Sequence, residues 1–578
     1  MIRTWRVRAP GGQAASSLAA ATGLPQTVTS LLVNRGVLSA DDVRAFLAPK
    51  LSELQDPLGL RGMTEATALV LDALDRDDPI VIYGDYDVDG MTAASVLFRF
   101  FRSVGVTPRV FLPDRFRDGY GLNPDRLGEL IDEGAKLVIT VDCGISAVEP
   151  IRMARERGVD VIIVDHHRLP RGELPPASAT INPHHPECSF PFKDLCAAGL
   201  AFHLAVALRS AMRSRGDFLE SAEPDVRDLL DLVAIGTIAD VVPLRGLNRM
   251  LVHAGLPRIE RAKSPGVRAL RTVSLKQSAV TGGGVAFHMA PRLNAAGRLS
   301  SPMKGFEILT TLDATVAQAI AAELNEENGA RKAIQESIEA EAISQALREQ
   351  GEDAPAYVLW DAGWHTGVAG IVAARIVERF HRPAAVIALV DGVGKGSLRS
   401  ISGFDVLAGL ERCSDLLIQY GGHAHAAGVT IDPAQLPAFR AAFAAAAREL
   451  TPEASLTPSI NIDAVLGFAE ITSEFIEQLT ALAPFGAGNP EPVFASHDVR
   501  VVERRQAGKT GEHFRLVLQE GGLTLPAIAF RIGERCPLPG DLVDVAYRAR
   551  FNDFDQRPTL QLEIIDLKPS EPRSEAST

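Results

Sequence analysis

Four strand-length runs of apolar, largely β-branched residues in the first third of the chain constrain its fold more than any other feature. The runs are PIVIYGD (79–85), RVFLPD (109–114), KLVITVD (136–142) and VDVIIVD (159–165). Continuous apolar runs of this length are typical of strands that are buried on both faces of a sheet. Helix-like stretches such as TAASVLFRFFRSVG separate them. This alternation predicts βαβ units and a doubly wound parallel sheet.

The rest of the chain predicts three further structural units. Residues 313–350 are rich in Ala, Glu, Gln and Lys, and Gly329 is almost their only helix breaker, so we expect a long helix that bridges two domains. A second α/β segment follows, with strands at AYVLWD (356–361) and AAVIALV (384–390) around a helix. Five short alternating strands between about 499 and 568 then predict a small OB-like β-barrel.

These patterns predict an α/β multidomain protein, and a length of 578 residues agrees with several domains of about 100–200 residues each. We predict an N-terminal helical segment (1–45), a first α/β domain with the parallel sheet (46–305), a long connecting helix (306–352), a second α/β domain (353–450), an OB-like barrel (451–568) and a disordered tail (569–578).

Composition excludes some classes of protein. The net charge of −13 argues against a protein coated in positive charge, such as a histone-like packager, although a local basic groove remains compatible with it. The five cysteines lack CxxC or zinc-finger spacing, which indicates reduced thiols. The sequence shows neither an apolar signal segment at its start nor an apolar run long enough to span a membrane. We therefore expect a soluble, cytoplasmic protein without a membrane partner.

Acidic residues follow three of the predicted strands. The groups are Asp85, Asp87 and Asp89 after the first run, Asp142 after the third, and Asp165 with His166 and His167 after the fourth. In an open parallel sheet, ligands bind at the carboxyl ends of the strands, so these side chains are expected to meet at one rim. So much negative charge in one place is costly unless cations neutralise it.

Divalent metal ions would neutralise such a rim. Carboxylates with one or two imidazoles suit Mn²⁺ or Mg²⁺, with Mn²⁺ preferred where histidine nitrogen contributes. Two ions about 3.5–4 Å apart, sharing one carboxylate, can activate water for attack on a phosphorus atom. Taken alone, an Asp after a strand is as often a helix cap, and a pair of histidines is more often structural. Several acidic groups on successive elements favour the metal site.

The motifs that carry these residues resemble those of the DHH phosphoesterase superfamily. GDYDVDG (84–90), VDCG (141–144) and VDHH (164–167) match in order and spacing, and the match extends from about residue 40 to about residue 565. The later matching stretches are GTIADVVPL (236–244), APRLNAAGR (290–298), WHTGVAGIVAAR (364–375), GKGSLRSISGFD (394–405), GGHAHAAGVTI (421–431) and LAPFGAGNPEPVF (482–494). They resemble the single-strand-specific DNA exonucleases within the superfamily.

The resemblance implies roles for the acidic and histidine residues. The metal ligands would be Asp87, Asp89, Asp142, His166 and Asp240, with Asp142 shared by two ions. His167 would contact the scissile phosphate and Asp165 would orient an imidazole, so that the catalytic set is Asp142, Asp165, His166 and His167. Asp85 either binds metal directly or supports the loop. Asp240 is preferred because ADVVPL matches the family motif, but spacing alone does not exclude Asp231, nine residues earlier.

The second α/β domain resembles a DHHA1 domain, which holds phosphates and nucleic acid beside the catalytic DHH domain. GGHAHAAG contains Gly421, Gly422 and His423 and suits close backbone approach to a phosphate, although alone it would as often be a tight turn. The other candidate phosphate-binding residues are Arg115, Arg292, Asn294, Arg298, His365, Ser397 and Arg399. Any single arginine among them would more often be a surface residue.

The predicted barrel carries basic residues around one hairpin. They are Arg500, Arg504, Arg505, Lys509, His513 and Arg515, with Arg548 and Arg550 on a later strand. A barrel can hold single strands through basic and aromatic side chains, and Arg504, Arg505, Lys509 and Arg515 are the predicted contacts to DNA. The alternative is a hairpin that only exposes charge to solvent.

The resemblance implies a metal-dependent exodeoxyribonuclease. Such an enzyme would degrade single-stranded DNA in the 5′-to-3′ direction by two-metal catalysis, releasing 5′-mononucleotides during DNA repair and recombination. Its cofactors would be two divalent ions, Mn²⁺ in preference to Mg²⁺. A single-strand-binding protein and a helicase are expected partners, and the lack of a long heptad seam favours a monomer.

Three alternatives differ in what they would require of the sequence. A small-substrate phosphoesterase, acting on oligoribonucleotides, cyclic dinucleotides or pyrophosphate, needs neither the barrel nor the long helix. A catalytically inactive DNA-binding scaffold should lack ligand carboxylates, which are all present here. A polymer-binding OB protein without chemistry leaves the acidic rim unexplained.

Overall fold

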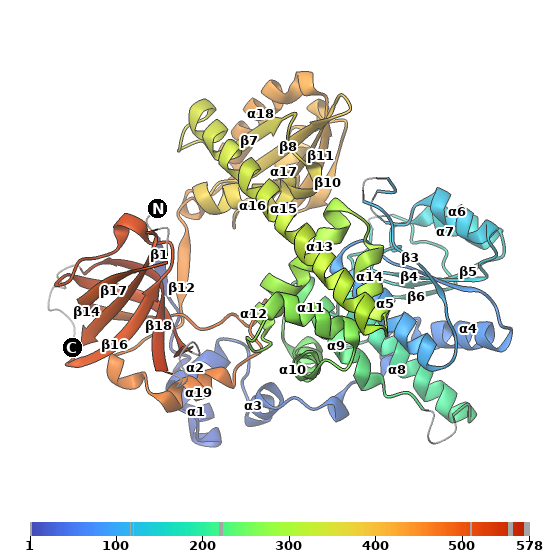
Figure 1. The fold of residues 1–578 in the computed structure, drawn as a ribbon, viewed down its shortest axis with the longest axis horizontal. Coiled ribbons are helices and arrows are strands. Elements are labelled where there is room, and N and C mark those ends of the chain that lie inside the picture. The colour runs from blue at the N-terminus through green and yellow to red at the C-terminus, as the bar shows by residue number, and fades with distance from the viewer. Residues whose placement is uncertain are drawn as a thin grey trace.

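The computed structural model describes residues 3–115, 117–119, 121–170, 172–218, 223–508, 511–552 and 559–570. The chain forms three lobes, of which the first and the second are joined by one long helix (Figure 1). We call residues 51–312 the first lobe, 353–450 the second lobe, and 459–570 together with 3–47 the barrel lobe. No helix of the described residues combines the length and the apolar character needed to cross a membrane.

The first lobe is built on a five-stranded parallel sheet of strand order β3-β2-β4-β5-β6. Its strands are β2 (Ile80–Tyr83), β3 (Arg109–Phe111), β4 (Leu137–Val141), β5 (Asp160–Val164) and β6 (Ala179–Ile181). The four predicted runs are β2 to β5, which confirms the doubly wound sheet. Strand β6 was not predicted, because its residues ATI lie among polar residues and prolines and not in a longer apolar run.

Helices cover both faces of this sheet. The helices of the lobe are α4 (Met63–Asp75), α5 (Val88–Ser103), α6 (Pro124–Asp132), α7 (Val148–Glu156), α8 (Ala197–Arg215), α9 (Leu230–Ala239), α10 (Gly246–Arg261), α11 (Pro265–Leu275), α12 (Gly282–Gly284), the π-helix η4 (Val285–Met289), α13 (Ala290–Leu299) and α14 (Met303–Thr310). Alternate strand residues face opposite sides. Ile82 and Ile139 pack in the core with α4, α5, α8 and α9, whereas Val81 and Val138 pack in the core with α6 and α7.

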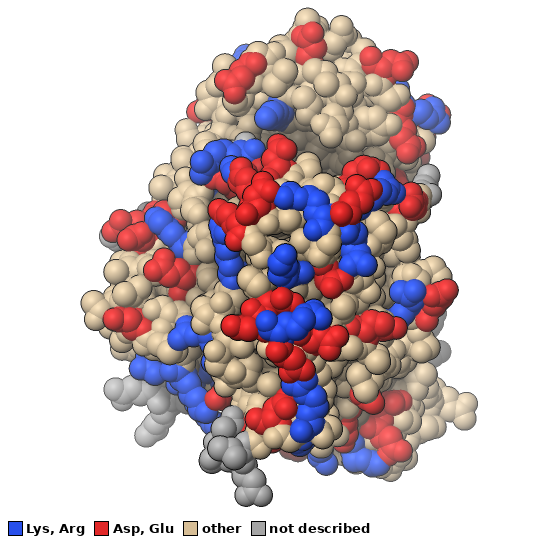
Figure 2. Space-filling view, turned by 90° about the vertical axis from the view of Figure 1, so that its right-hand side faces the viewer, with Lys and Arg blue, Asp and Glu red and all other residues tan. Residues whose placement is uncertain are grey.

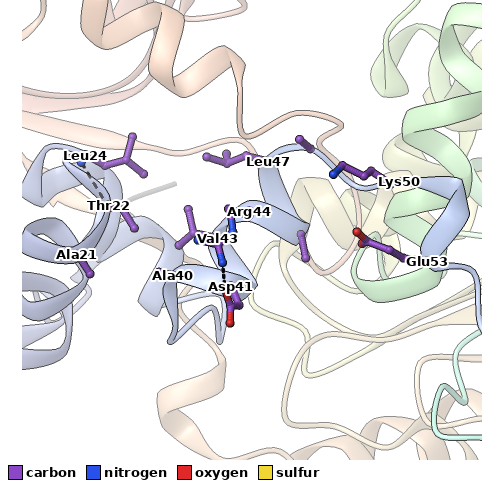
Figure 3. Close-up of a pocket in the computed structure, with 12 residues that line it drawn as sticks. Ala21, Thr22, Leu24, Ala40, Asp41, Val43, Arg44, Leu47, Lys50 and Glu53 are labelled. Atoms are coloured by element: carbon purple, nitrogen blue, oxygen red, sulfur yellow. Dashed lines mark hydrogen bonds and ion pairs between the residues drawn. The ribbon is translucent and has the colours of Figure 1, made fainter.

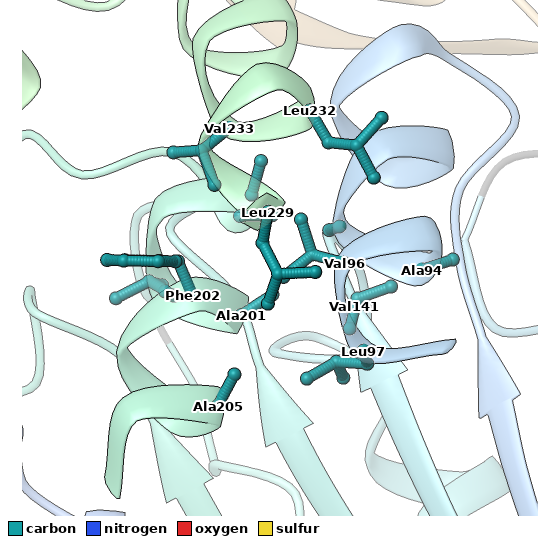
Figure 4. Packing of buried hydrophobic residues seen from close by; sticks show 14 of the residues in the cluster. Ala94, Val96, Leu97, Val141, Ala201, Phe202, Ala205, Leu229, Leu232 and Val233 are labelled. Atoms are coloured by element: carbon teal, nitrogen blue, oxygen red, sulfur yellow. The ribbon is translucent and has the colours of Figure 1, made fainter. Parts of the chain in front are cut away.

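The larger core fixes α5 and α8 against the sheet. Figure 4 shows Leu97 of α5, Val141 of β4 and Ala201 of α8 together in this core, with Leu232 of α9 close by. All are buried. The tight packing matters for function because the beginning of α5, the beginning of α8 and the end of α9 all lie at the carboxyl rim of the sheet.

Helix α15 (Ala314–Glu349) connects the first and second lobes, where the sequence predicted a long helix over 313–350. At 1.5 Å per residue it is about 54 Å long. Ala317 and Leu324 belong to the core of the first lobe, while Ile338 and Ala346 belong to a core of the second lobe. A single rigid element therefore spaces the two lobes.

The second lobe contains a mixed sheet of order β10-β11-β9-β8-β7, in which only β7 and β8 are parallel. The strands are β7 (Tyr357–Asp361), β8 (Ala384–Val390), β9 (Val393–Arg399), β10 (Gln419–His423) and β11 (Ala426–Ile431). The helices are α16 (Thr366–Phe380), α17 (Val406–Glu411) and α18 (Leu436–Leu450). The two predicted strands and the predicted helix are β7, β8 and α16.

The third lobe holds a closed five-stranded barrel, as predicted. Its strands are β14 (Phe494–Ala507), β15 (His513–Glu520), β16 (Leu523–Ala529), β17 (Leu542–Asn552) and β18 (Thr559–Pro569), and β14 pairs with both β15 and β17 to close it. Strand β13 (Ala464–Val465) pairs with β14, and α19 (Ser473–Thr480) lies between these two strands in the chain. Strand β18 includes Pro569, and Ser570 donates its backbone N–H to Leu542, so the predicted tail begins too early; residues 571–578 lie outside the described part.

The start of the chain belongs to the barrel lobe (Figure 1). Strand β1 (Thr4–Val7) pairs in parallel with β12 (Ser459–Ile462), and it is followed by α1 (Gly12–Thr22), α2 (Gln26–Val33) and α3 (Ala40–Leu47). Leu31 and Val43 share a core with Phe475 and Phe494. The pairing of segments more than 450 residues apart explains why β1, expected to be helical, could not be predicted locally.

Arg249 of α10 ties the first lobe to the barrel lobe. Its side chain is almost wholly buried, with the guanidinium 3.7 Å from the centre of the Phe46 ring. It donates hydrogen bonds to the carbonyl oxygens of Phe46 and Ala483, each at 2.7 Å. Arg249 thus contacts both segments of the barrel lobe, α3 near the start of the chain and the stretch that follows α19.

Candidate metal centre

The carboxyl ends of β2, β4 and β5 bring the predicted acidic residues together. Asp87 caps α5, and its Oδ1 accepts the backbone N–H groups of Asp89 at 2.9 Å and Gly90 at 3.1 Å. Asp142 directly follows β4, Asp165 directly follows β5, and Asp240 stands at the end of α9. Helix caps and metal ligands are therefore not exclusive interpretations, because Asp87 caps a helix inside the cluster.

Three groups of side chains place their ligand atoms within 4.8 Å of one another. They are Asp142 with His166 and His167, Asp89 with His166 and Asp240, and Asp85 with Asp87 and Asp142. Asp142 belongs to two of these groups, as does His166. His166 Nε2 lies 3.2 Å from Asp142 Oδ1, 3.7 Å from Asp240 Oδ2 and 3.8 Å from Asp89 Oδ2. This arrangement can hold two neighbouring cations that share Asp142.

The residues present fit divalent metal ions. Four ligand atoms are buried and lack a hydrogen-bond partner among the described residues, namely Asp85 Oδ1, Asp142 Oδ1, His166 Nε2 and Asp240 Oδ2. Buried polar atoms are rarely left without partners, and each one costs about 1–3 kcal/mol. A donor set of carboxylate oxygens and imidazole nitrogen suits Mn²⁺ or Mg²⁺.

Burial and mutual repulsion perturb the pKa values of these carboxyls. Burial, and then the charge of Asp87, raises the pKa of Asp85 to about 8. Burial, and then the charge of Asp89, raises the pKa of Asp240 to about 9. The same causes raise the pKa of Asp142 well above its usual range. Burial also lowers the pKa of His166, so that its ring is neutral, as metal binding requires.

Asp165 and His167 form a separate ion pair at the edge of the cluster. Asp165 Oδ1 lies 2.7 Å from His167 Nδ1 and accepts the backbone N–H of His167 at 3.0 Å. Although burial alone would lower it, this interaction raises the pKa of His167 to about 9. Asp165 thus orients an imidazole, and His167 carries a positive charge at neutral pH.

The backbone around the centre is fixed from outside the cluster. The first two N–H groups of α8, from Ala197 and Ala198, donate to the two oxygens of Asp89 at 2.7 and 2.9 Å. Asp142 and Val241 both have left-handed backbone φ values, of 63° and 62°. Such conformations are strained in residues other than glycine and concentrate at functional sites. The sequence motifs did not predict either of these two backbone conformations.

The structure separates Asp240 from Asp231. Asp240 belongs to one of the three ligand groups, whereas Asp231 lies at the opposite end of α9 and pairs with Arg99 at 3.1 Å. This geometry favours Asp240 as the ligand. It also places Asp85 among the possible ligands, beside Asp87 and Asp142.

A cluster of arginines lies beside the metal centre, between the first and second lobes. Arg115 stacks over the ring of Tyr86, and Arg298 donates to the carbonyl of Gly367 in the second lobe at 2.7 Å. Burial, and then the charges of Arg115, Arg331 and Arg399, lowers the pKa of Arg298 to about 10. Figure 2 shows the surface hollowed between the second lobe at the top and the first lobe below it. Cations gathered at such a place suit a phosphate.

Arg331 was missed from the sequence. It lies on α15, almost wholly buried, and donates to the amide oxygens of Asn328 and Gln335. Its sequence context is that of any long polar helix, so only the packing of α15 against α13 brings it near Arg298.

The structure distributes the remaining predicted phosphate-binding residues over several elements. Ser397 and Arg399 lie on β9, and His365 caps α16 by accepting the N–H of Gly367 at 3.0 Å. Asn294 is half-buried on α13. Gly421, Gly422 and His423 form the exposed strand β10 of a hairpin, in which the φ of 144° at Gly422 favours glycine. Phosphate binding by these residues remains a prediction.

The basic residues of the barrel differ in their surroundings. Arg504 stacks over Phe514 at 4.4 Å, and Arg505 lies opposite Arg515 on the same hairpin. Lys509 lies outside the described residues. Arg548 and Arg550 form ion pairs with Glu491 and Glu563, so they add less positive charge than their number suggests.

A hollow of about 810 Å³ lies between α1 and α3, near the start of the chain (Figure 3). Leu24, Val43 and Leu47 line it, with Arg44 and Asp41 paired at its edge. It contains none of the metal-binding groups, and we assign no chemistry to it.

Comparisons with known proteins agree with this architecture. Family models match the chain as the DHH family N-terminal domain over residues 79–237, the DHHA1 domain over 353–449 and the RecJ OB domain over 462–566. The chain is 36% identical to the single-stranded-DNA-specific exonuclease RecJ of Bacillus subtilis, over 98% of this chain and 71% of that protein. It is also 36% identical to RecJ of Escherichia coli, over 94% of this chain and 96% of that protein.

Solved structures give the same result. The crystal structure of RecJ from Thermus thermophilus in complex with Mn²⁺ superposes with a TM-score of 0.84 at 32% identity, covering 98% of this chain and 80% of that chain. The complex of that protein with Mg²⁺ gives a TM-score of 0.78 at 31% identity, covering 98% and 79%. The divalent cations in these complexes agree with the ligand groups found here.

The first prediction concerns pH. In the folded, metal-free protein the pKa of Asp85 is about 8 and that of Asp240 is about 9, whereas the unfolded value is about 3.9. The stability that these carboxyls contribute is therefore fully present below about pH 3.9 and is lost as the pH rises through the folded values. Protons compete with cations over this range. The rise in melting temperature caused by Mn²⁺ should therefore be larger at about pH 8 than at about pH 6. An increment that is constant or falls with pH would contradict the assignment.

The second prediction separates the two aspartates of α9, the half-buried Asp240 at its end and the buried Asp231 at its start. Asp240→Asn should weaken Mn²⁺ binding at least about tenfold in calorimetric titration, because it removes a ligand charge. Asp231→Asn is the matched control, since Asp231 is an aspartate of the same helix that lies outside the ligand groups, and it should retain wild-type affinity for Mn²⁺. Equal loss in both variants, or loss only in Asp231→Asn, would refute the choice of Asp240.

Proposed function

The chain belongs to the RecJ family of DHH phosphoesterases, and on this basis we propose that it degrades single-stranded DNA from the 5′ end with two divalent metal ions. Curated members of the family are single-stranded-DNA-specific exonucleases, and the similarity extends over nearly the whole chain. The protein is accordingly a hydrolase that acts on DNA phosphodiester bonds. The direction of degradation, the release of 5′-mononucleotides and the number of ions are the parts that we propose.

One observation carries the two-ion proposal. Asp142 belongs both to the group with Asp85 and Asp87 and to the group with His166 and His167. A carboxylate in this position can bridge two cations. Two-metal phosphodiesterases place their ions about 3.5–4 Å apart, which a shared carboxylate allows.

The side chains of the metal centre have different roles in hydrolysis. Bound divalent ions supply Lewis-acid activation of water and neutralise charge on the attacking and leaving oxygens. The carboxylates of Asp87, Asp89 and Asp142 hold such ions in place, while the N–H groups at the start of α8 orient Asp89. His167, kept protonated by Asp165, donates a hydrogen bond to a non-bridging oxygen of the scissile phosphate.

The arginine cluster supports binding of a terminal phosphate. Arg115 and Arg298 lie beside Tyr86, and Tyr86 belongs to the loop that carries Asp85 and Asp87. A 5′-phosphate held by Arg115, Arg298 and Arg399 with Ser397 would leave the next phosphodiester bond at the metal centre. This placement gives release of one nucleotide at a time from the 5′ end.

The barrel and the long helix extend the site for a polymer. We propose that residues 46–305 carry the chemistry, that residues 353–450 hold phosphate, and that residues 451–568 hold the incoming strand. A monomer working in the cytoplasm with a single-strand-binding protein and a helicase completes the proposal. The similarity over the barrel argues against a small-substrate phosphoesterase, and the complete ligand set argues against an inactive scaffold.

Asp142→Ala tests the proposed chemistry. The variant should lose at least about 10³-fold in turnover of single-stranded DNA at saturating Mn²⁺, because the ligand shared by both ions is removed. The measurement follows 5′-labelled and 3′-labelled strands and a blunt duplex. The wild type should release a labelled mononucleotide at once from the 5′ label, release the 3′ label late, and spare the duplex.

Other outcomes have definite meanings. Wild-type turnover in Asp142→Ala would refute the shared ligand. Early release of the 3′ label would refute the proposed direction. Hydrolysis confined to strands of a few nucleotides would restore the small-substrate alternative.

A further inference from the structure

Phe287 is the most exposed aromatic side chain of the described residues, and the proposed mechanism does not use it. It is 75% exposed, on the π-helix η4. A single exposed apolar residue needs no explanation by itself. A π-helical turn is rare, however, and occurs mostly at functional sites. The exposed ring and the π-helical turn together indicate a ligand-binding role for Phe287, which the residues around η4 support.

The position of η4 places Phe287 between the metal centre and the barrel lobe. The π-helix packs against α9, the helix that ends at Asp240. The preceding turn, α12, touches the segment that leads into the barrel, because a Cβ at Gly282 would lie only 2.6 Å from the carbonyl oxygen of Phe485. In Figure 1, α12 lies on the side of the first lobe that faces the barrel. A strand that runs along this side, between the barrel and the end of α9, would meet η4.

Two basic residues lie near His288, the residue that follows Phe287 on η4. Burial, and then the positive charges of Arg292 and Lys332, lowers the pKa of the neighbouring His288. Arg292 donates to the carbonyl of His288 at 2.7 Å and to the amide oxygen of Asn325 at 2.9 Å, both of them neutral acceptors. Burial also lowers the pKa of Arg292. An exposed aromatic ring among such cations is the arrangement by which proteins bind single strands.

We propose that Phe287 stacks on a base of the DNA strand on its way to the metal centre, while Arg292 and Lys332 contact the adjoining phosphates. The inference rests on the proposed exonuclease function and adds a positioning residue to it. The aromatic face supplies contact with any base, and the neighbouring cations neutralise the backbone. Phe287 thereby keeps the strand in register between successive cleavages, when the metal centre has released a nucleotide.

Substitution of Phe287 tests the stacking directly. Phe287→Ala should raise KM for a strand of about twenty nucleotides roughly 5- to 50-fold with little change in kcat, as expected for loss of one stacked base. Phe287→Trp should restore the wild-type KM, and Phe287→Leu should not. Leu58→Ala is the matched control, because Leu58 is 52% exposed on the first lobe but outside this surface, and it should behave as the wild type.

Abasic substrates separate stacking from a structural effect. A single abasic nucleotide, moved along the strand, should weaken binding to the wild type most at one position, and Phe287→Ala should lose that position-specific effect. The shortest hydrolysable strands, which do not reach Phe287, should be cleaved equally by both proteins.

Two results would overturn the inference in different ways. Equal KM values for active wild type and Phe287→Ala, or full rescue by Phe287→Leu, would refute stacking while the exonuclease function stands. A wild type that fails to hydrolyse single-stranded DNA would refute the proposed function itself, and the inference with it.

Discussion

The repulsion among buried carboxylates at the rim of the parallel sheet is the constraint on which the rest of the structure depends. Asp85, Asp89 and Asp142 are each no more than 2% exposed, and their pKa values are raised by burial and by the charge of the neighbouring Asp87. Such a cluster is tolerable only with protons or with cations. Its ligand atoms are grouped for cations, and the two oxygens of Asp89 are fixed by the start of a helix, whose dipole favours negative charge.

The remaining architecture serves this centre from a distance. Helix α15 spaces the second lobe so that Arg399 comes near Arg115 and Arg298, and Arg249 holds the barrel lobe against α10. Cations that face the metal centre come from both lobes, whereas the cluster of carboxylates belongs to the first lobe alone. An anionic polymer is the ligand that joins two such surfaces, since its phosphates bind to metal ions and to arginines alike.

Much of this could be predicted from the sequence, because the responsible signals are local. Continuous apolar runs identified β2 to β5, and the lack of helix breakers identified α15. What was missed depends on contacts between distant segments. Strand β1 exists only through its pairing with β12, and Arg331 comes near Arg298 only because α15 packs against α13. Spacing alone could not separate Asp231 from Asp240. The two residues lie at opposite ends of α9, and only the folded structure shows which end lies at the rim of the sheet.

The proposed two-ion catalysis depends on the shared role of Asp142. A crystal of the protein grown with Mn²⁺, measured at the manganese absorption edge, would locate the ions independently of any activity. We expect two anomalous peaks about 3.5–4 Å apart, both in contact with the carboxylate of Asp142. A single peak, or two peaks that Asp142 does not bridge, would contradict the two-ion centre.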